Sequence, residues 1–469
     1  MTFTDNPSAV VNSVRDKEEG IYMNKSKDRG ILQGSLWKAI LLFALPIAAG
    51  NMLQQLFNTA DVAIVGKFAG KEALAAVGSN GPIINLLLNL FIGISVGANV
   101  VIARFIGEGN DEKVKKASHT AVAVSVISGI IVMILGLFLA RPMLEMMNSP
   151  EDVIDLAALY LRIYFLGMPF MMLYNFSAAI LRSRGDTKRP LICLSVSGVI
   201  NVILNLIFVI CFHMSVAGVA LATVIANAVS AALVFYFLTK EKGALKIEVK
   251  NLKIDKDILI SFAKIGIPSG LQGAVFSASN IFVQSSLNSL GSDFMAGSSA
   301  ALNFEFYVYH LMSGFSQAVV TFTGQNYGAG NYRRCRSVAK WCIFLAVALG
   351  SILVTVMMLL RSKMVYIFTD ETIVAQIAIV RMMYILPFIM INSVSDILSG
   401  SMRGVGHSLV PAMITIAGVC GVRLIWIYTI FEKMKNFEIL MMIYPVSWAI
   451  TAVGIISAYF VIRKKELMR

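Results

Sequence analysis

Long apolar runs separated by short polar segments divide the whole sequence. A helix that crosses the hydrocarbon core of a membrane needs about 20 mainly apolar residues. Twelve runs reach that length, and charges, glycines or prolines bound them. They lie at 37–63, 81–103, 118–140, 153–177, 190–211, 217–238, 262–286, 298–322, 341–360, 376–400, 409–430 and 441–461. This pattern predicts an all-α integral membrane protein with twelve transmembrane helices.

The composition excludes several other classes of protein. Of the 469 residues, 57% are hydrophobic and 14% are charged, whereas soluble domains average about 45–50% and about 25%. An ordinary soluble enzyme and a disordered chain are therefore both excluded. The five cysteines and four histidines show no metal-binding spacing, so we expect no cofactor and no structural metal. A net charge of +13 on so few charged residues indicates contact with anionic membrane lipids rather than with nucleic acid.

The distribution of lysine and arginine predicts the topology. With the N-terminus inside, the cytoplasmic segments contain 30 Lys and Arg residues and the outer segments contain 7. Cytoplasmic loops carry such an excess in multi-pass proteins. The first residues lack the basic-then-apolar layout of a cleaved signal. We therefore expect a multi-pass protein of the cell inner (cytoplasmic) membrane with both termini in the cytoplasm.

A charged stretch midway along the chain predicts two halves of six spans each. The predicted division is a cytoplasmic tail at 1–35, an N-lobe at 36–238, a cytoplasmic linker at 239–258, a C-lobe at 259–461 and a second cytoplasmic tail at 462–469. Because six is an even number, both halves enter the bilayer in the same sense. That arrangement gives a pseudo-two-fold axis along the membrane normal, with a cleft between the lobes.

Short motifs recur between the halves at a nearly constant offset. Two pairs of motifs lie 221 residues apart: Gly107-Glu108-Gly109-Asn110 with Gly328-Ala329-Gly330-Asn331, and Leu181-Arg182-x-x-Gly185 with Met402-Arg403-x-x-Gly406. Pro46 and Asn58 match Pro268 and Asn280 at 222, and Pro169 matches Pro387 at 218. The shared order supports an internal repeat. We interpret the glycine motifs as helix ends and tight turns rather than phosphate-binding loops.

Asp61 is the acidic residue with the most organised polar surroundings. A carboxylate inside a span is costly unless it faces protein or water, so it usually has a function. Gln54, Asn58 and Asp61 follow i, i+4, i+7 spacing and share one helix face. Pro46 lies in the same predicted helix and favours a kink.

Two later helices of the N-lobe carry polar faces that can pack against Asp61. The side chains concerned are Ser197, Asn201 and Asn205 on the fifth span and Thr223 and Asn227 on the sixth. Packed together, these faces enclose a pocket for a proton or for Na⁺, which prefers oxygen ligands. The predicted ion-coupling residues are Asp61, Asn58, Asn201, Asn205 and Thr223. Two alternatives stay open. Asp61 ends its helix and faces outer water, or the amide and hydroxyl side chains only join helices.

The C-lobe offers a second group of polar candidates. Asn392 and Asp396 share a face of the tenth span, and Asn280 and Gln284 share a face of the seventh. Glu305 stands in an aromatic setting, which suits a lipophilic cation through charge and cation–π attraction. The alternative for Glu305 is an internal ion pair with Arg162, Arg381 or Arg423. The predicted substrate-binding residues are Gln54, Asn280, Gln284, Glu305, Asn392 and Asp396.

Together these motifs resemble the multidrug and toxic compound extrusion (MATE) family of cation-coupled antiporters, over residues 35–461. The resemblance rests on Pro46 with Asp61, on Gly324-Gln325-Asn326-Tyr327-Gly328-Ala329, and on the two turns that contain Leu181-Arg182 and Met402-Arg403. It implies a V-shaped pair of six-helix lobes that works by alternating access.

The resemblance also implies roles for particular residues. In bacterial and archaeal relatives, the N-lobe cation site uses residues that match Asp61, Asn201 and Thr223. The position of a second carboxylate in those relatives is Asn205 here, so a single carboxylate stays at the site. Acids found in two C-lobe helices of some relatives are replaced by Phe276 and Asn392, so Glu305 or Asp396 would serve instead.

The resulting hypothesis is a secondary active multidrug efflux antiporter, and not an enzyme. It exchanges H⁺ or Na⁺ for lipophilic organic cations, and we expect it to act as a monomer. The first alternative is a lipid-linked oligosaccharide flippase of the same broader superfamily, which needs a strongly basic cavity. A membrane-embedded enzyme would need a clustered nucleophile–base or metal constellation. A passive channel fits poorly with polar groups divided between two lobes.

Overall fold

The computed structural model describes residues 30–146, 151–366 and 371–468, and within these ranges it contains helices and no strand. The first half comprises α2 Leu36–Phe68, α3 Lys71–Ser79, α4 Gly81–Gly107, α5 Asp111–Met146, α6 Glu151–Leu166, α7 Met168–Ser183, α8 Lys188–Leu206, η1 Ile207–Cys211 and α9 Ser215–Thr239. Two short turns, η2 Gly243–Leu245 and η3 Val249–Asn251, follow in the charged middle stretch. Most of the predicted tail at 1–35 lies outside the described residues.

The second half repeats the order of long helices, with more interruptions. It comprises α10 Lys256–Asn288, α11 Ser292–Gly328, α12 Tyr332–Val365, α13 Thr372–Ile385, η4 Leu386–Phe388, α14 Ile389–Gly404, α15 Leu409–Thr415, η5 Ile416–Gly421, α16 Val422–Trp426, η6 Ile427–Phe431, α17 Glu432–Met434 and α18 Phe437–Glu466. Across both halves, the short elements η1, η5 and η6 are π-helical segments within longer helices.

Fewer helices satisfy the length and hydropathy criteria for spans than the twelve expected. Ten described helices are long and apolar enough to cross a membrane, or eleven when the bent pair α6 and α7 counts as one span. The helix that fails is α11, which has 37 residues. Several of its polar side chains are covered by protein, among them Ser298, Thr321 and Gln325. A helix surrounded by other helices need not be apolar.

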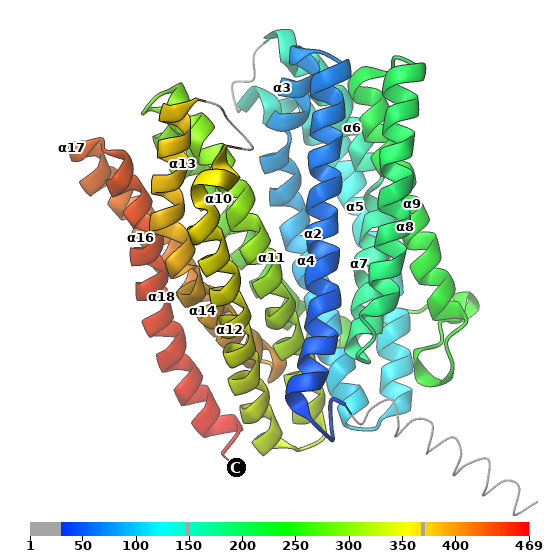
Figure 1. Cartoon of the computed structure of the whole chain (residues 1–469). Coiled ribbons are helices and arrows are strands. Elements are labelled where there is room, and N and C mark those ends of the chain that lie inside the picture. Colours follow the sequence, from blue (N-terminus) through cyan, green and yellow to red (C-terminus); the bar gives the residue numbers. More distant parts are fainter. Residues whose placement is uncertain (1–29, 147–150, 367–370, 469) are drawn as a thin grey trace, which may run out of the picture.

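The helices form two groups that diverge toward one end (Figure 1). The elements from α2 to α9 lie on the right of the view, and those from α10 to α18 lie on the left. The start of α2, the C-terminus and the stretch at 240–255 all lie at the lower end in this view. We call this the linker end and the opposite one, where α3 lies, the far end.

Proline and glycine interrupt both halves at matching places. The break at Gly167 between α6 and α7, two residues before Pro169, bends the chain by 47°, and Pro387 lies in η4 between α13 and α14. Positive φ angles occur at Gly109 (68°) and Gly330 (70°), and again at Gly185 (98°) and Gly406 (96°). Each pair lies 221 residues apart. The prediction that these glycines form turns at helix ends is confirmed.

The broadest contact between the two groups joins α4 to α10. Gly93 and Gly97 on α4 face Gly266 and Gly270 on α10, and a β-carbon at any of the four would overlap the opposite backbone. Small residues spaced four apart let helix backbones approach closely in membranes. The two bundles are therefore joined by a seam of direct backbone contact.

Hydrogen bonds continue the contact between the groups toward the linker end, where α4, α7 and α11 finish. Thr321 on α11 donates to Asn99 Oδ1 on α4 at 2.9 Å, and Gln325 donates to the carbonyl of Ser183 at 2.5 Å. Arg182 donates to Gln317 Oε1 at 2.7 Å. The two groups of helices are consequently tied together at the linker end.

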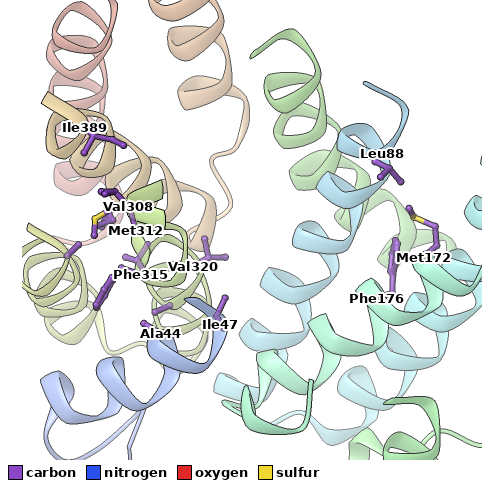
Figure 2. Packing of buried hydrophobic residues seen from close by; sticks show 14 of the residues in the cluster. Ala44, Ile47, Leu88, Met172, Phe176, Val308, Met312, Phe315, Val320 and Ile389 are labelled. Atoms are coloured by element: carbon purple, nitrogen blue, oxygen red, sulfur yellow. The ribbon is translucent and has the colours of Figure 1, made fainter. Parts of the chain in front are cut away.

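Helix α2 has partners in both groups. Its first half packs on α11, where Phe43 meets Phe322 at 5.3 Å between ring centroids and the Ala44 carbonyl lies against Gly314; Figure 2 shows Ala44 and Ile47 on this part of α2. Figure 2 also shows that Leu88 and Phe176 pack in a separate patch of the first half. Past Pro46, α2 turns to α8: the leucines at 191 and 194 lie next to Gly50.

Candidate functional site

Asp61 lies in the far half of α2 and is buried, with 7% of its surface exposed. The alternative in which this carboxylate faces outer water therefore does not hold. Burial of a charged group away from water is unfavourable unless other groups hydrogen-bond to it. Its surroundings decide what it can do.

Polar side chains from α8 and α9 form one chain of hydrogen bonds that ends on Asp61. Asn205 donates from Nδ2 to Asp61 Oδ1 at 2.5 Å and to Asn201 Oδ1 at 3.3 Å. Asn201 in turn donates to the Thr223 hydroxyl at 3.4 Å. Thr223 donates to the carbonyl of Val219 on its own helix at 2.9 Å. The structure thus brings together four of the five predicted ion-coupling residues.

A glycine permits the close approach of α2 and α8 at this site. A β-carbon at Gly198 would overlap the ring of Phe57, one turn before Asp61. Asn201 and Asn205 follow Gly198 at intervals of one helical turn, so they line the same face of α8. The π-helical segment η1 begins two residues after Asn205, and such segments are frequent at functional sites.

Two tyrosines on α6 lie within electrostatic range of Asp61 and form no hydrogen bond with it in the described part of the chain. Tyr160 and Tyr164 are close enough for the carboxylate charge to act on both hydroxyls. Their rings stack with centroids 5.9 Å apart. Sequence reasoning missed this pair. The available signal was their spacing of four residues, which places two hydroxyl-bearing rings on one helix face.

Two predicted residues of α2 lie outside this cluster. Gln54 and Asn58 are exposed, whereas Asp61 is buried. Helical spacing put the three on one side of α2, but α8 covers only the part of that side that carries Asp61. Pro46 stands 15 residues before Asp61, about 22 Å along the helix at 1.5 Å per residue.

Glu305 forms the internal ion pair that was the alternative to binding a lipophilic cation. Arg381 donates to it from Nε at 2.7 Å and from Nη2 at 3.1 Å, on separate carboxylate oxygens. Both residues are buried. Such a bidentate pair is strong and directional, and it neutralises the charge that would otherwise attract a cationic ligand.

The other predicted substrate-binding residues of the C-lobe lie apart from one another. Asn280 accepts a hydrogen bond from Arg423 at 2.7 Å, while exposed Gln284 donates to Asn288. Asn392 and Asp396 are half-buried on α14, and Ser316 donates to the backbone carbonyl of Asp396 at 3.4 Å. These residues do not form one site in this conformation.

Within the described residues, no three His, Cys, Asp or Glu side chains are grouped so as to hold a metal ion. The oxygen-rich group around Asp61 contains one carboxylate and three amide or hydroxyl side chains. It can hold a proton on the carboxyl group, or a cation that prefers oxygen ligands.

The family model described as MatE matches the chain twice, at residues 46–207 and 268–429. The chain belongs to the MATE family. Both matched segments begin at the proline of a first helix, Pro46 or Pro268. Because this is a family of transporters, the membrane-embedded enzyme considered as an alternative is excluded.

Proteins similar to this MATE chain include bacterial multidrug resistance and export proteins. A probable multidrug resistance protein YoeA of Bacillus subtilis is 30% identical, over 93% of this chain and 96% of that protein. A probable multidrug resistance protein NorM of Thermotoga maritima is 27% identical, over 86% of each chain. The multidrug export protein MepA of Staphylococcus saprophyticus is 19% identical, over 88% and 94%.

Solved structures show that the fold is shared. An outward-facing multidrug resistance MATE transporter of the MOP superfamily superposes with a TM-score of 0.85 at 23% identity, over 93% of this chain and 99% of that chain. A MOP superfamily transporter from Pyrococcus furiosus, described as having a binding pocket of reverse polarity, gives 0.85 at 23% identity, over 94% and 98%. This MATE chain is therefore an all-helical, multi-pass membrane protein with the MATE fold.

Proposed function

We propose that this protein is a secondary active antiporter that exports lipophilic organic cations in exchange for H⁺ or Na⁺. The observation that carries the proposal is the buried Asp61 carboxylate, held by Asn205 within a chain of amide and hydroxyl groups. The relatives are named as multidrug resistance and export proteins, which supports drug-like molecules as cargo.

Asn205 can form a hydrogen bond with the Asp61 side chain whether that carboxyl group is ionised or protonated. Its nitrogen donates to the ionised carboxylate, while its own Oδ1 is buried and has no hydrogen-bond partner among the described residues. An amide can present either its N–H or its oxygen by rotating about its terminal bond. When Asp61 takes up a proton, Asn205 Oδ1 accepts from the new hydroxyl. A Na⁺ ion would instead use the oxygens of Asp61, Asn201 and Asn205.

Helix α2 connects this event to the arrangement of the two bundles. Its far half carries Asp61 against α8, and its first half packs on α11 of the other bundle. Pro46 lies at the transition between the two and removes a backbone hydrogen-bond donor. Binding of a cation at Asp61 changes the hydrogen bonds between α8 and α2, and α2 changes its bend at Pro46.

The arrangement of the helices supports alternating access with the linker end closed. In this proposal twelve spans form two lobes, with α11 as the span that protein rather than lipid surrounds. The seams at Gly93 and Gln325 close the linker end, which we assign to the cytoplasm together with both termini because the lysines and arginines concentrate there. The lobes separate toward the outside, where cargo leaves. The cell inner membrane is the expected location and a monomer the expected state.

The energy available from one coupling cation is sufficient for drug export. One elementary charge that crosses 100 mV supplies about 2.3 kcal/mol. Since about 1.4 kcal/mol changes an equilibrium tenfold, a single charge sustains a gradient of roughly fifty-fold. A monovalent drug exchanged for one proton moves no net charge, and the pH gradient then supplies the energy.

The decisive experiment measures efflux of a fluorescent cationic dye from proteoliposomes with imposed pH or sodium gradients, applied separately. We expect the Asp61→Asn variant to lose gradient-driven efflux while remaining folded. Asp155→Asn is the matched control, since that carboxylate is exposed on α6. Wild-type efflux by Asp61→Asn would overturn the proposal. Flipping of a radiolabelled lipid-linked oligosaccharide without dye efflux would favour the flippase instead.

A further inference from the structure

The C-lobe contains a buried cluster whose polarity is opposite to that of the Asp61 site. Arg423 on α16 is fully buried at 0% exposure. It donates from Nη1 to Asn280 at 2.7 Å and from Nε to the Ser447 hydroxyl at 3.4 Å. The guanidinium carbon of Arg423 lies 4.6 Å from the centroid of the Tyr444 ring, which belongs to α18. It lies 5.3 Å from the centroid of the Phe276 ring, which belongs to α10.

The internal repeat places this cluster in the position that corresponds to the Asp61 site. The two segments matched by the family model lie 222 residues apart at both ends. At that offset Asn201 corresponds to Arg423, and α2, the helix that carries Asp61, corresponds to α10. Each site is thus built from the first, fifth and sixth helices of its half, but an amide in one is a guanidinium in the other.

The charges of the C-lobe cluster do not balance. Glu305 neutralises Arg381, and the Tyr444 ring lies between the two arginines, 5.5 Å from Arg381. No carboxylate among the described residues pairs with Arg423. A guanidinium stays protonated in proteins, and an unpaired charge in the bundle interior is costly. The cluster therefore has one uncompensated positive charge.

The unsatisfied polar atoms at the two sites have opposite hydrogen-bonding character. At the Asp61 site the unpartnered buried atom is an acceptor, Asn205 Oδ1. In the C-lobe cluster the unpartnered buried atoms are donors, Arg423 Nη2 and Trp448 Nε1. Trp448 packs against Tyr444 with 5.7 Å between ring centroids. The described residues supply both donors with no acceptor.

The backbone around Arg423 is irregular in a way typical of ligand sites. The short helix α16 lies between two π-helical segments, η5 and η6. Such segments widen a helix locally and are frequent at functional sites. By widening the helix on both sides of Arg423, they allow a ligand to reach its guanidinium group when the C-lobe opens.

We propose that the Arg423 cluster binds a compact anionic group. Its negative charge sits against Arg423 Nη2 and the Trp448 indole N–H, beside the Tyr444 ring, and offsets the unbalanced guanidinium. The chemistry fits a carboxylate on the transported molecule or a small inorganic anion such as chloride. The protein then has two sites of opposite sign, one per lobe, and zwitterionic cargo becomes a substrate class that a purely cation-binding pocket would not favour.

The test uses the purified full-length protein in detergent without any gradient, so its outcome is independent of cation-coupled export. Sodium chloride and sodium acetate are titrated at constant ionic strength against sodium gluconate, whose anion is bulky. We expect a saturable rise in unfolding temperature and a saturable change in tryptophan fluorescence with at least one of the two anions. Responses identical to gluconate for both anions would overturn the proposal.

Variants then assign the response to Arg423. Arg423→Gln is expected to weaken the apparent anion affinity at least tenfold, and Arg423→Lys to retain part of it. The control is Arg361→Gln, since within the described residues Arg361 donates to the carbonyl of Met358 in its own helix, α12, and to no carboxylate. An unchanged response in a folded Arg423→Gln protein would also overturn the proposal. If Arg423→Gln does not fold, the wild-type titration alone decides.

A transport experiment separates the two sources of the anion. Efflux of a zwitterionic drug with one carboxylate is compared with efflux of its methyl ester, in chloride and in gluconate. A carboxylate of the cargo predicts that the ester is exported at least several-fold more slowly in both salts. An inorganic anion predicts equal rates for drug and ester and a loss of both in gluconate. Equal rates throughout would contradict both sources.

Discussion

The backbone of Gly270 occupies the place where a side chain on Gly93 would begin. One residue belongs to each bundle, and the seam between them lies where α4 and α10 have their broadest contact. Contact at this distance replaces side-chain packing with direct backbone packing, which is possible only for the smallest residue. The close contact of the two bundles, and with it the closed linker end, therefore depends on glycine, which has no side chain, at these positions.

A valine at Gly93 is expected to open this seam. Its side chain has no space beside Gly270, so the bundles must separate or the helices must shift. The measurement is labelling of a cysteine introduced at Thr321 by a membrane-impermeant maleimide applied at the linker end. We expect the labelling rate to rise at least fivefold relative to the unsubstituted seam.

The control for this substitution is Gly78→Ala on α3, where an added β-carbon would meet nothing within 4 Å. It should leave the labelling rate unchanged. An unaltered rate in a folded Gly93→Val protein would show that the seam does not close the linker end.

Replacing Asn205 with leucine should disable the Asp61 site without removing the carboxylate. The substitution leaves a buried carboxylate without its donor, a loss of about 1–3 kcal/mol for such a group. We expect dye efflux in proteoliposomes to fall at least tenfold. Asn303→Leu is the comparison, because the Asn303 side chain donates to the carbonyl of Ser299 on its own helix and has no other hydrogen bond in the described part of the chain. Equal losses in the two variants would argue against a specific role for Asn205.

The Glu305–Arg381 pair should be far more important for stability than an exposed pair. Removing one partner of a buried ion pair costs about 3–5 kcal/mol, because the other charge stays buried and unpaired. Arg381→Met and Glu305→Gln are therefore each expected to lower the unfolding temperature in detergent markedly. Glu145→Gln removes a partner of exposed Arg141 and should change the unfolding temperature little. The double variant Glu305→Leu, Arg381→Met should recover much of the loss, and a further decrease would contradict this explanation.

Glu241, just after α9, should make stability depend on acidity at the linker end. Burial acts to raise its pKa, but the hydrogen bond and charge of Arg189 and the charge of Arg184 together hold the pKa below its usual value. Arg184 donates to it at 2.8 Å. A lowered carboxyl pKa contributes stability above the pKa of the unfolded chain, and this contribution disappears as the pH falls through the folded pKa.

The measurement for Glu241 is the unfolding temperature between neutral pH and about pH 3, compared with Glu241→Gln. The wild-type protein should be the more stable at neutral pH, and the difference should shrink as the solution is acidified. A difference that stays constant with pH would mean that Glu241 acts through packing rather than through charge.

Features imposed by the membrane were the easiest to predict from the sequence. Apolar runs reveal spans because lipid cannot satisfy polar groups, and turn glycines such as Gly109 and Gly330 reveal helix ends because their φ is positive. Among the described helices, the long one that does not meet the hydropathy expected of a span is α11, several of whose polar residues are covered by protein. Hydropathy measures suitability for lipid and does not register burial against other helices.

The site was only partly predictable, because helix periodicity gives the face but not the neighbour. Asp61, Asn201, Asn205 and Thr223 were expected together, and hydrogen bonds join them. Asn58, on the same side of α2 in projection, is exposed. For Glu305 the sequence offered three arginines, and only the packing of α13 on α11 selects Arg381. Tyr160 and Tyr164 escaped notice because tyrosines in a span look like ordinary core.

The polar interior of α11 has a consequence for biosynthesis. This helix does not reach the hydropathy expected of a span, and Glu305 and Gln325 on it are covered by neighbouring helices in the folded protein. Its retention in the bilayer during synthesis therefore has to wait for neighbours, among them α2 and α4, which the ribosome has already made. The amino-terminal bundle would then serve as an assembly template for the second, and in a carboxy-terminal fragment expressed alone α11 should insert poorly.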